Sequence, residues 1–188
     1  MASELIRAFL ALPLAPSFES DVRPLLEKLG RDYPATRWVE ASQIHATLHF
    51  FGSIPSEEVE KISGFIRPIA SRSKPLQIVL KGFGAFPSPS RPRVIWVGME
   101  GDTEGLKNLH RFVEKELEKN GFPIESRGFK PHLALGRIRE GKKFSDFPEI
   151  QFGPTGSKSI NVMVLFQSPL TPQGARYEAI ETYPFSPP

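Results

Sequence analysis

The stretch IHATLHFF, residues 44–51, has the composition of a β-strand, because β-branched and aromatic residues are frequent in it. Side chains in a strand point alternately to two faces. Strict alternation therefore predicts that His45, Thr47 and His49 share one face. An imidazole and a hydroxyl on one face, about 6.6 Å apart at their Cα atoms, can contact two oxygens of one phosphate group. His49 can equally be a packed histidine.

The spacing of His45 and His49 also occurs in zinc proteases, where both histidines lie on one helix. Position 46 is Ala in this chain, whereas that motif needs Glu. On a strand, four residues span about 13 Å, which is too far for two ligands of one metal ion. We therefore expect no metal ion and no other cofactor.

A second histidine stretch, HLAL at residues 132–135, lies in another predicted strand, 131–138. His132 follows the strand start at Val94 by 38 positions, and His45 follows the strand start at Ile6 by 39 positions. This spacing indicates an internal duplication. The chain has four histidines, and we expect the fourth, His110, to have a solvated or packing role on a helix.

Apolar periodicity between these stretches alternates between the strand and the helix period. Helices are predicted over 18–29, from Ser56 to Ile69, and from an N-terminal cap at Asp102 to Gly121. Pro and Gly predict loops over 82–93 and 168–174. Further strands are predicted over the ranges 6–12, 76–81, 94–97, 159–166 and 176–185.

Composition sets outer limits on the function. The 188 residues suit one domain, and the absence of cysteine excludes disulfides, thiolate nucleophiles and cysteine-based metal centres. No stretch approaches the roughly 20 apolar residues of a membrane-spanning helix, so we expect a cytoplasmic protein without a membrane partner. A net charge of +3 permits an anionic partner.

The ordered motifs resemble the two-histidine phosphoesterases, which carry paired His-x-Thr-x tetrads, and within them the RNA 2′,3′-cyclic phosphodiesterases, also called 2′-5′ RNA ligases. The resemblance rests on both histidine stretches and on the segments IRAFLALP (6–13), PRVIWVG (92–98), FKPHLALGR (129–137) and QSPL through GARY (167–177). It implies an α+β fold with two pseudo-symmetric lobes around a central cleft, each lobe an antiparallel sheet with helices on its outer face. Residues 1–188 then form a single domain with lobes at about 1–90 and 91–188, and exchange of strands between the lobes is left open.

The resemblance also implies an activity and assigns residues to it. The expected reaction is hydrolysis of RNA 2′,3′-cyclic phosphate ends to 2′-phosphates, with 2′-5′ ligation as the reverse reaction. His45 is then the proton donor to the leaving 3′ oxygen, and His132 is the base that activates water. Thr47 would bind the phosphate, while Ala134 replaces the second hydroxyl and offers only its backbone. Arg137 could bind phosphate too, although strict alternation turns it away from His132 unless a bulge or a strand end lies there.

Further candidates surround these residues. RNA ends or 2′,3′-cyclic nucleotides are the expected partners, with no obligate protein partner, and an aromatic ring could stack on a base. The loop-adjacent candidates for stacking are Phe83, Phe86 and Tyr177, and those for steering a polyanion are Arg91, Arg93, Arg127 and Lys130.

Two other functions compete with this hypothesis. One is hydrolysis of a different small phosphodiester, such as a cyclic phosphate of ADP-ribose or a 2′-5′ oligoadenylate. The other is an inactive RNA- or nucleotide-binding module of the same fold, which the missing hydroxyl at Ala134 would suit.

Overall fold

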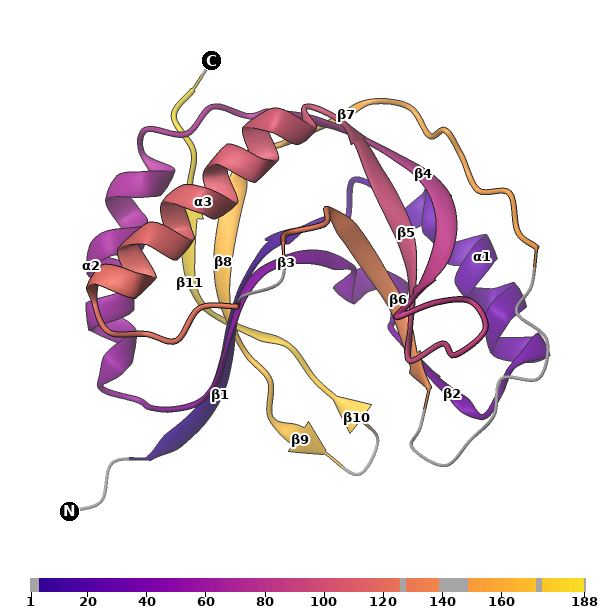
Figure 1. The fold of residues 1–188 in the computed structure, drawn as a ribbon, viewed down its shortest axis with the longest axis horizontal. Coiled ribbons are helices and arrows are strands. Elements are labelled where there is room, and N and C mark those ends of the chain that lie inside the picture. Colours follow the sequence, from indigo (N-terminus) through magenta and orange to yellow (C-terminus); the bar gives the residue numbers. More distant parts are fainter. Residues whose placement is uncertain (1–3, 126–127, 139–148, 172–173, 188) are drawn as a thin grey trace.

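Two antiparallel sheets form the centre of the molecule, and helices pack on their outer sides (Figure 1). The computed structural model describes residues 4–125, 128–138, 149–171 and 174–187. The elements in chain order are β1 (Leu5–Pro13), α1 (Glu19–Asp32), β2 (Thr36–Trp38), the 3-10 helix η1 (Ala41–Gln43), β3 (His45–Pro55), α2 (Glu58–Ala70), β4 (Leu76–Phe86), β5 (Val94–Gly101), α3 (Thr103–Lys119), β6 (His132–Ile138), β7 (Lys158–Ile160), β8 (Val162–Gln167), β9 (Leu170–Thr171), β10 (Gly174–Ala175) and β11 (Glu178–Pro184).

Each sheet takes strands from both halves of the chain. The first sheet has the order β11-β8-β1-β3, and the second has the order β2-β6-β5-β4-β7. The short strands β9 and β10 pair as a separate hairpin. The predicted α+β fold with two antiparallel sheets is confirmed. The histidine-bearing strands β3 and β6 belong to different sheets and contact each other where the sheets meet.

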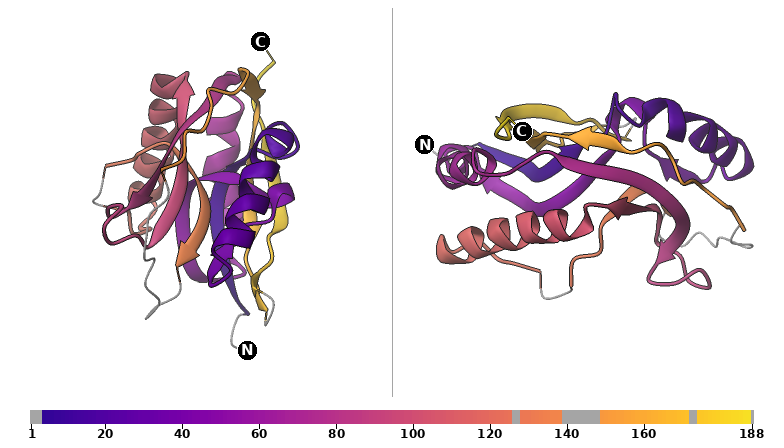
Figure 2. Two further views of the ribbon diagram at one scale, coloured as in Figure 1. Left: turned by 90° about the vertical axis from the view of Figure 1, so that its right-hand side faces the viewer. Right: turned by 90° about the horizontal axis from the view of Figure 1, so that it is seen from above.

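The helices cover the outer faces of both sheets, as the two views in Figure 2 show. Helices α2 and α3 contact each other, and both contact β3 of the first sheet. Helix α1 contacts β2 at one edge of the second sheet, and Lys158 of β7, at the other edge, donates from Nζ to the Ser17 carbonyl near the start of this helix (2.6 Å). Among the described residues, no helix is both long and apolar enough to cross a membrane.

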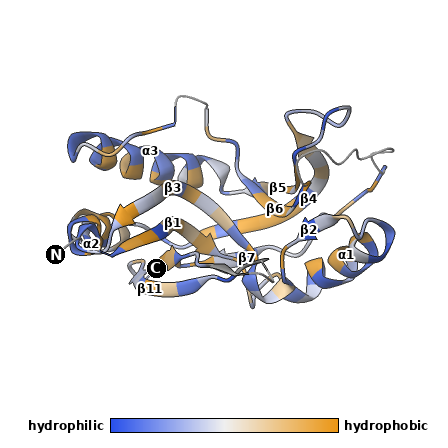
Figure 3. Cartoon of the chain, turned by 90° about the horizontal axis from the view of Figure 1, so that it is seen from below, coloured by the Kyte–Doolittle hydropathy of each residue, from blue (hydrophilic) through white to orange (hydrophobic). Residues whose placement is uncertain are grey.

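Helix α3 shows how the sequence specifies these elements. The Asp102 carboxylate accepts a hydrogen bond from the Gly105 backbone N–H (2.9 Å), as the predicted cap requires. One face of the helix is buried through Leu106, Leu109, Val113 and Leu117. Hydropathy drawn along the chain shows the helices striped with polar and apolar residues and the central strands richer in apolar ones (Figure 3). Burying each such leucine stabilises the fold by about 1.5–3 kcal/mol.

Both segments that were predicted as loops contain strand residues. Strand β4 continues through residues 82–86, which were expected to be a loop, because Gly84 and Phe86 pair with Trp96 and Val94 of β5. Gly82 makes this continuation possible, since its φ of +81° is one that L side chains rarely adopt. The segment 168–174 contains β9 and the start of β10, and residues 172–173 lie outside the described part.

Two β-bulges in β3 decide which side chains face the second sheet. Along β1, every residue has a partner, but β3 has an extra residue at Leu48 and another at Phe51. Leu10 therefore pairs with His49, and Phe9 pairs with Phe50. Directly paired residues point to the same side of a sheet, so the Leu48 bulge turns His49 toward the helices and Phe50 to the opposite face.

Strand β6 contains the corresponding bulge. Trp96 of β5 pairs with Ala134, and the next residue, Ile95, pairs with Gly136, so Leu135 is the extra residue. Arg137 then pairs with Val94, on the face that also carries Trp96 and Ala134. In the first sheet, we call the face that carries His45 the site face. In the second sheet, the site face is the one that carries His132.

Candidate active site

His45 and His132 are held in the same way. Nδ1 of His45 donates to the carbonyl oxygen of Gln43 (2.8 Å), and Nδ1 of His132 donates to the carbonyl oxygen of Lys130 (2.7 Å). Since a carbonyl oxygen only accepts, Nδ1 carries a proton in each ring. Nε2 is therefore the nitrogen available to a substrate: it accepts a proton in the neutral ring and donates one in the charged ring.

An aromatic ring packs edge-on against each imidazole. Tyr177 lies 5.0 Å from His45 between ring centroids at an interplanar angle of 87°, and Phe86 lies 5.0 Å from His132 at 90°. Phe9 adds a tilted contact to His45 at 4.9 Å. Both histidines are partly buried. These contacts fix the ring orientation that the backbone hydrogen bond selects.

Burial and nearby charges lower the pKa of both histidines. For His45, burial is the largest cause; the Gln43 carbonyl opposes it, and the positive charges of Arg137 and His132 add to it. For His132, burial again lowers the pKa most, the Lys130 carbonyl opposes this, and Arg137 adds to it. Both rings are therefore weaker bases than an exposed histidine. The effects of His132 and Arg137 on His45 indicate that both of these groups lie within electrostatic range of the His45 ring.

The bulge at Leu135 brings Arg137 to the site face, which is the condition under which the sequence allowed it to approach the site. Its guanidinium charge acts on His45, His132 and Tyr177. Arg137 is exposed, so an anion from solvent can reach it. A planar cation whose charge acts on both imidazoles suits the charge of a phosphate group.

The two positions for a phosphate-binding hydroxyl are not equivalent. Thr47 pairs with Ala11 and lies on the site face with His45. Ala134 takes the corresponding place beside His132 and pairs with Trp96. The Trp96 ring occupies the space that a side chain at Gly84 would need, because a Cβ there would lie 2.4 Å from it. The second sheet thus has the methyl group of Ala134 beside a packed tryptophan ring where the first has a hydroxyl.

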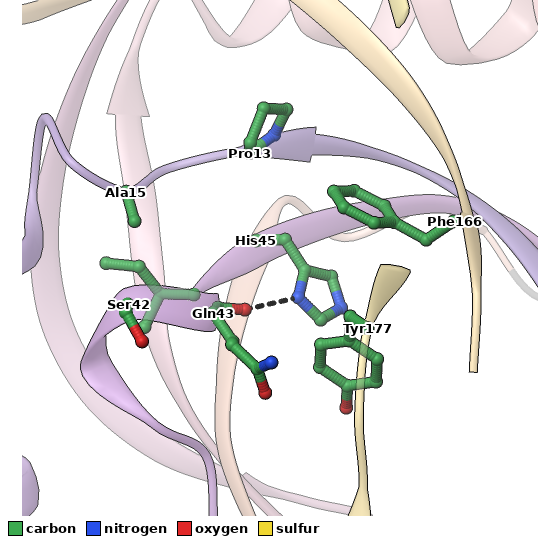
Figure 4. A pocket seen from close by; sticks show the side chains of 8 residues that line it. Pro13, Ala15, Ser42, Gln43, His45, Phe166 and Tyr177 are labelled. Carbon is green, nitrogen blue, oxygen red and sulfur yellow. Dashed lines mark hydrogen bonds between the residues drawn. The ribbon is translucent and has the colours of Figure 1, made fainter. Parts of the chain in front are cut away.

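A pocket lies directly beside His45. Its wall combines aromatic side chains with polar groups, and Figure 4 shows the rings of Phe166 and Tyr177 beside the imidazole, with the Ser42 hydroxyl and the Gln43 amide along the rest of the lining. Pro13, Ala15 and Ile44 complete it. Aromatic side chains combined with a few polar groups are typical of the lining of small-molecule sites.

The other two histidines lie away from this site. His49 was expected on the same face as His45, and this is wrong because the Leu48 bulge reverses the alternation. Its side chain is 3% exposed, and Nδ1 contacts the Glu114 carboxylate of α3 (2.8 Å). His110 stacks on Phe129 with ring centroids 4.0 Å apart, so it packs against a neighbouring segment.

Only some of the remaining predicted residues lie near the two histidines. Phe86 and Tyr177 contact the histidines, and Lys130 lies near them, its Nζ 5.9 Å from the Phe86 ring centroid. Phe83 pairs with the buried Val97 and packs against the hydrophobic core, on the face opposite His132. That position does not suit the predicted stacking on a base. Arg91 and Arg93 are exposed in the β4–β5 connection, and Arg127 lies outside the described residues.

Sequence reasoning did not identify several residues that surround His45. Phe9, Phe166, Ser42 and Gln43 all contact the ring or line its pocket. Phe9 lies in the predicted strand 6–12, but its neighbours Ala8 and Leu10 are buried as well, so no alternation distinguishes it. Gln43 contributes its backbone carbonyl. Because every residue type has this group, the sequence cannot indicate which one binds the histidine.

Comparison with known proteins relates this site to one family. Residues 12–96 match the family model described as LigT like phosphoesterase. An RNA 2′,3′-cyclic phosphodiesterase of Methanothermobacter thermautotrophicus is 32% identical over 182 residues, which is 95% of this chain and 98% of that protein. A crystal structure of a Thermus thermophilus protein has a TM-score of 0.78 and 27% identity, covering 96% of this chain and 98% of its own.

A third match concerns the fold alone. The structure of E. coli LigT complexed with 3′-AMP has a TM-score of 0.76 and 23% identity, and the match covers 97% of this chain and 99% of that one. The order of motifs, the paired histidines and the full-length similarity agree. The chain belongs to the LigT-like phosphoesterase family, which includes the RNA 2′,3′-cyclic phosphodiesterases.

Proposed function

We propose that this phosphoesterase opens 2′,3′-cyclic phosphates at RNA ends to 2′-phosphates by acid–base catalysis between His45 and His132, as a cytoplasmic enzyme. The observation that supports this most directly is the matched pair of Nδ1 hydrogen bonds, to Gln43 and Lys130. Each bond leaves the Nε2 atom of its ring available to a substrate, and the charge of Arg137 acts on both rings. The relatives named for this activity support the same substrate class.

In the proposed reaction, two proton transfers occur in one concerted step. Nε2 of neutral His132 takes a proton from water as the water oxygen forms a bond to phosphorus. The bond between phosphorus and the 3′ oxygen breaks, and Nε2 of protonated His45 gives its proton to that oxygen. A base and an acid of this kind each contribute about 10²–10⁴-fold. Exchange of protons with solvent then restores both rings.

The charges of the site favour the protonation states that this reaction needs. The lowered pKa of His132 keeps the base neutral near pH 7. A phosphodiester carries a negative charge, which favours the protonated form of His45 once the substrate is bound. Arg137 and the Thr47 hydroxyl stabilise the charge on the phosphoryl oxygens in the transition state. If a 5′-hydroxyl replaces water, the same geometry forms a 2′-5′ linkage.

The terminal nucleoside fits on the His45 side, because the leaving 3′ oxygen receives its proton from that ring. The pocket beside His45 provides the aromatic rings of Tyr177 and Phe166 together with the polar groups of Ser42 and Gln43. We assign the terminal base to this pocket. E. coli LigT, a protein of the same fold, has been crystallised with 3′-AMP.

The test is hydrolysis of a 2′,3′-cyclic nucleotide in excess chelator, with the products separated as 2′- and 3′-phosphates. Wild-type protein should yield the 2′-phosphate, and His45→Ala and His132→Ala should each lose at least 10²-fold in rate. His110→Gln is the matched control, since the His110 ring stacks on Phe129 and faces the Glu114 carboxylate. Full activity in either alanine variant would contradict the acid–base assignment. Nucleotide binding without turnover would instead favour the inactive binding module, and selective turnover of another phosphodiester would favour a different substrate.

A further inference from the structure

Arg7 and Phe50 form a cation–aromatic pair on the site face of the first sheet. The Cζ atom of Arg7 lies 4.7 Å from the centre of the Phe50 ring. Both side chains are exposed, and Phe50 is exposed by 46% although it is large and apolar. An exposed ring that orients a guanidinium is a typical component of surfaces that bind single-stranded nucleic acid.

The bulges of β3 place this pair on the same face as His45. Phe50 pairs with Phe9, whose ring contacts His45, and Arg7 precedes Phe9 by two residues on the regular strand β1. The backbone carbonyl of Arg7 also accepts a hydrogen bond from Ser168 N–H (2.7 Å). The chain that leads from β8 toward Tyr177 therefore starts beside Arg7.

Phe50 corresponds to Arg137 in the other lobe. Each residue lies five positions after its histidine, and each is brought to the site face by a bulge three positions after that histidine. Where the second lobe has a guanidinium, the first has a ring with the guanidinium of Arg7 above it. The first lobe thus also has a positive charge on its site face, but at a different position along the sheet.

Tyr177 is near both the Arg7 charge and His45. Burial raises the pKa of Tyr177, and the charges of Arg137 and Arg7 oppose that effect. The two histidines respond to Arg137, and Tyr177 directly contacts His45. The charge of Arg7 acts on Tyr177 but is not among the causes that shift either histidine, so Arg7 lies farther from the histidines than Arg137 does.

We propose that Arg7, oriented by Phe50, binds the phosphate that joins the terminal nucleotide to the preceding nucleotide of an RNA. This inference rests on the proposed function and adds to it a preference for an RNA end over a free cyclic nucleotide. A mononucleotide has no such phosphate. The substrate class that the site selects is then an oligoribonucleotide with a 2′,3′-cyclic end.

The experiment compares two substrates, a 2′,3′-cyclic mononucleotide and a short oligoribonucleotide with the same terminal base and a 2′,3′-cyclic end. For Arg7→Ala, we expect kcat/KM on the oligonucleotide to decrease at least tenfold more than on the mononucleotide, mainly through KM. The slope of log kcat/KM against log salt concentration should lose about 0.7 for the oligonucleotide, the value for one phosphate contact on a single strand. Arg7→Lys should keep that slope, because it keeps the charge.

Arg111→Ala is the matched control. Arg111 of α3 also lies over a phenylalanine, with Cζ 5.9 Å from the Phe112 ring centre, but on an outer helix. This variant should leave both substrates unaffected. Phe50→Leu should cause a smaller selective loss than Arg7→Ala, because the charge remains while its orientation is lost.

Three results would overturn the inference: an equal loss on both substrates, no loss on either, or an unchanged salt slope. If wild-type protein opens neither substrate, the proposed function is contradicted separately. The affinity for a 2′-phosphorylated oligoribonucleotide, measured by fluorescence anisotropy, then decides the inference. Weaker binding by Arg7→Ala with normal binding by Arg111→Ala supports it, and equal binding overturns it.

Discussion

Arg137 of β6 and His45 of β3 belong to different sheets, yet the positive charge of the arginine opposes protonation of the imidazole. Burial is the larger cause of the lowered His45 pKa, and Arg137 adds to it. The same arginine also lowers the pKa of His132, after burial. One exposed side chain therefore influences both the acid and the base of the proposed reaction.

Arg137→Gln should shift the pH dependence of kcat/KM as well as its size. The rate requires neutral His132, which sets the acidic limb, and protonated His45, which sets the basic limb. Removing the guanidinium raises the pKa of both groups, so both limbs should move to higher pH. The maximum should decrease roughly 10²-fold because a phosphate-binding cation is lost. A lower maximum at an unchanged pH would show that Arg137 has no electrostatic effect on the histidines.

Thr47→Ala should reduce kcat/KM by about 10²-fold, because it removes a donor to the phosphoryl oxygens. Thr47→Ser keeps the hydroxyl and should retain most of the rate. The reverse change, Ala134→Thr, adds a hydroxyl to the site face beside Trp96 and should increase the rate. Steady-state kinetics with a cyclic mononucleotide measures all three. Equal rates for Thr47→Ala and the wild type would remove Thr47 from the site.

Tyr177→Leu should raise KM for a cyclic nucleotide by about 5-fold to 10²-fold, since stacking of a base on an aromatic ring contributes about 1–3 kcal/mol. Tyr177→Phe keeps the ring that packs against His45 and should bind nearly as well as the wild type. The comparison separates the ring from the phenolic hydroxyl. A similar KM for Tyr177→Leu would place the base elsewhere.

Glu114→Ala should reduce the free energy of unfolding by about 1–3 kcal/mol, because Nδ1 of the buried His49 loses its acceptor. Glu114→Gln keeps an acceptor oxygen and should be less destabilised. Urea denaturation measures both variants. The kcat of the folded protein should remain within twofold, since the pair lies on the helix side of the sheet. A large loss of kcat in Glu114→Gln at normal stability would assign the pair a role in catalysis.

The sequence predicted the helices and the histidine strands well because their signals are local. The buried face of α3 recurs at the helical period, and its cap is a single Asp. The bulges at Leu48, Phe51 and Leu135 could not be predicted, because an extra residue in one strand is defined only by its partner. The positions of His49, Phe50 and Arg137 depend on those bulges. Strict alternation therefore assigns His49 and Phe50 to the wrong faces of the sheet, and it leaves the face of Arg137 undecided.

Phe83 illustrates a second limit. Its Pro- and Gly-rich surroundings predicted a loop, whereas pairing with β5 extends the strand and directs the ring into the core. Long-range pairing here outweighs local preference. The carbonyls of Gln43 and Lys130 were equally inaccessible to prediction, because every residue has a carbonyl and only the folded chain shows which one meets an imidazole.

The mixed origin of the sheets affects how the protein can be divided. Strands β1 and β3 share a sheet with β8 and β11, while β4 completes the sheet of β5 and β6. A fragment ending near residue 90 would keep β4 without its partner β5 and would lack β8, so neither sheet could form in it. We expect separately expressed halves to remain unfolded until mixed, and the whole protein to denature in one cooperative transition. During synthesis, His45 therefore acquires the rings of Phe166 and Tyr177 only after the C-terminal part of the chain has been made.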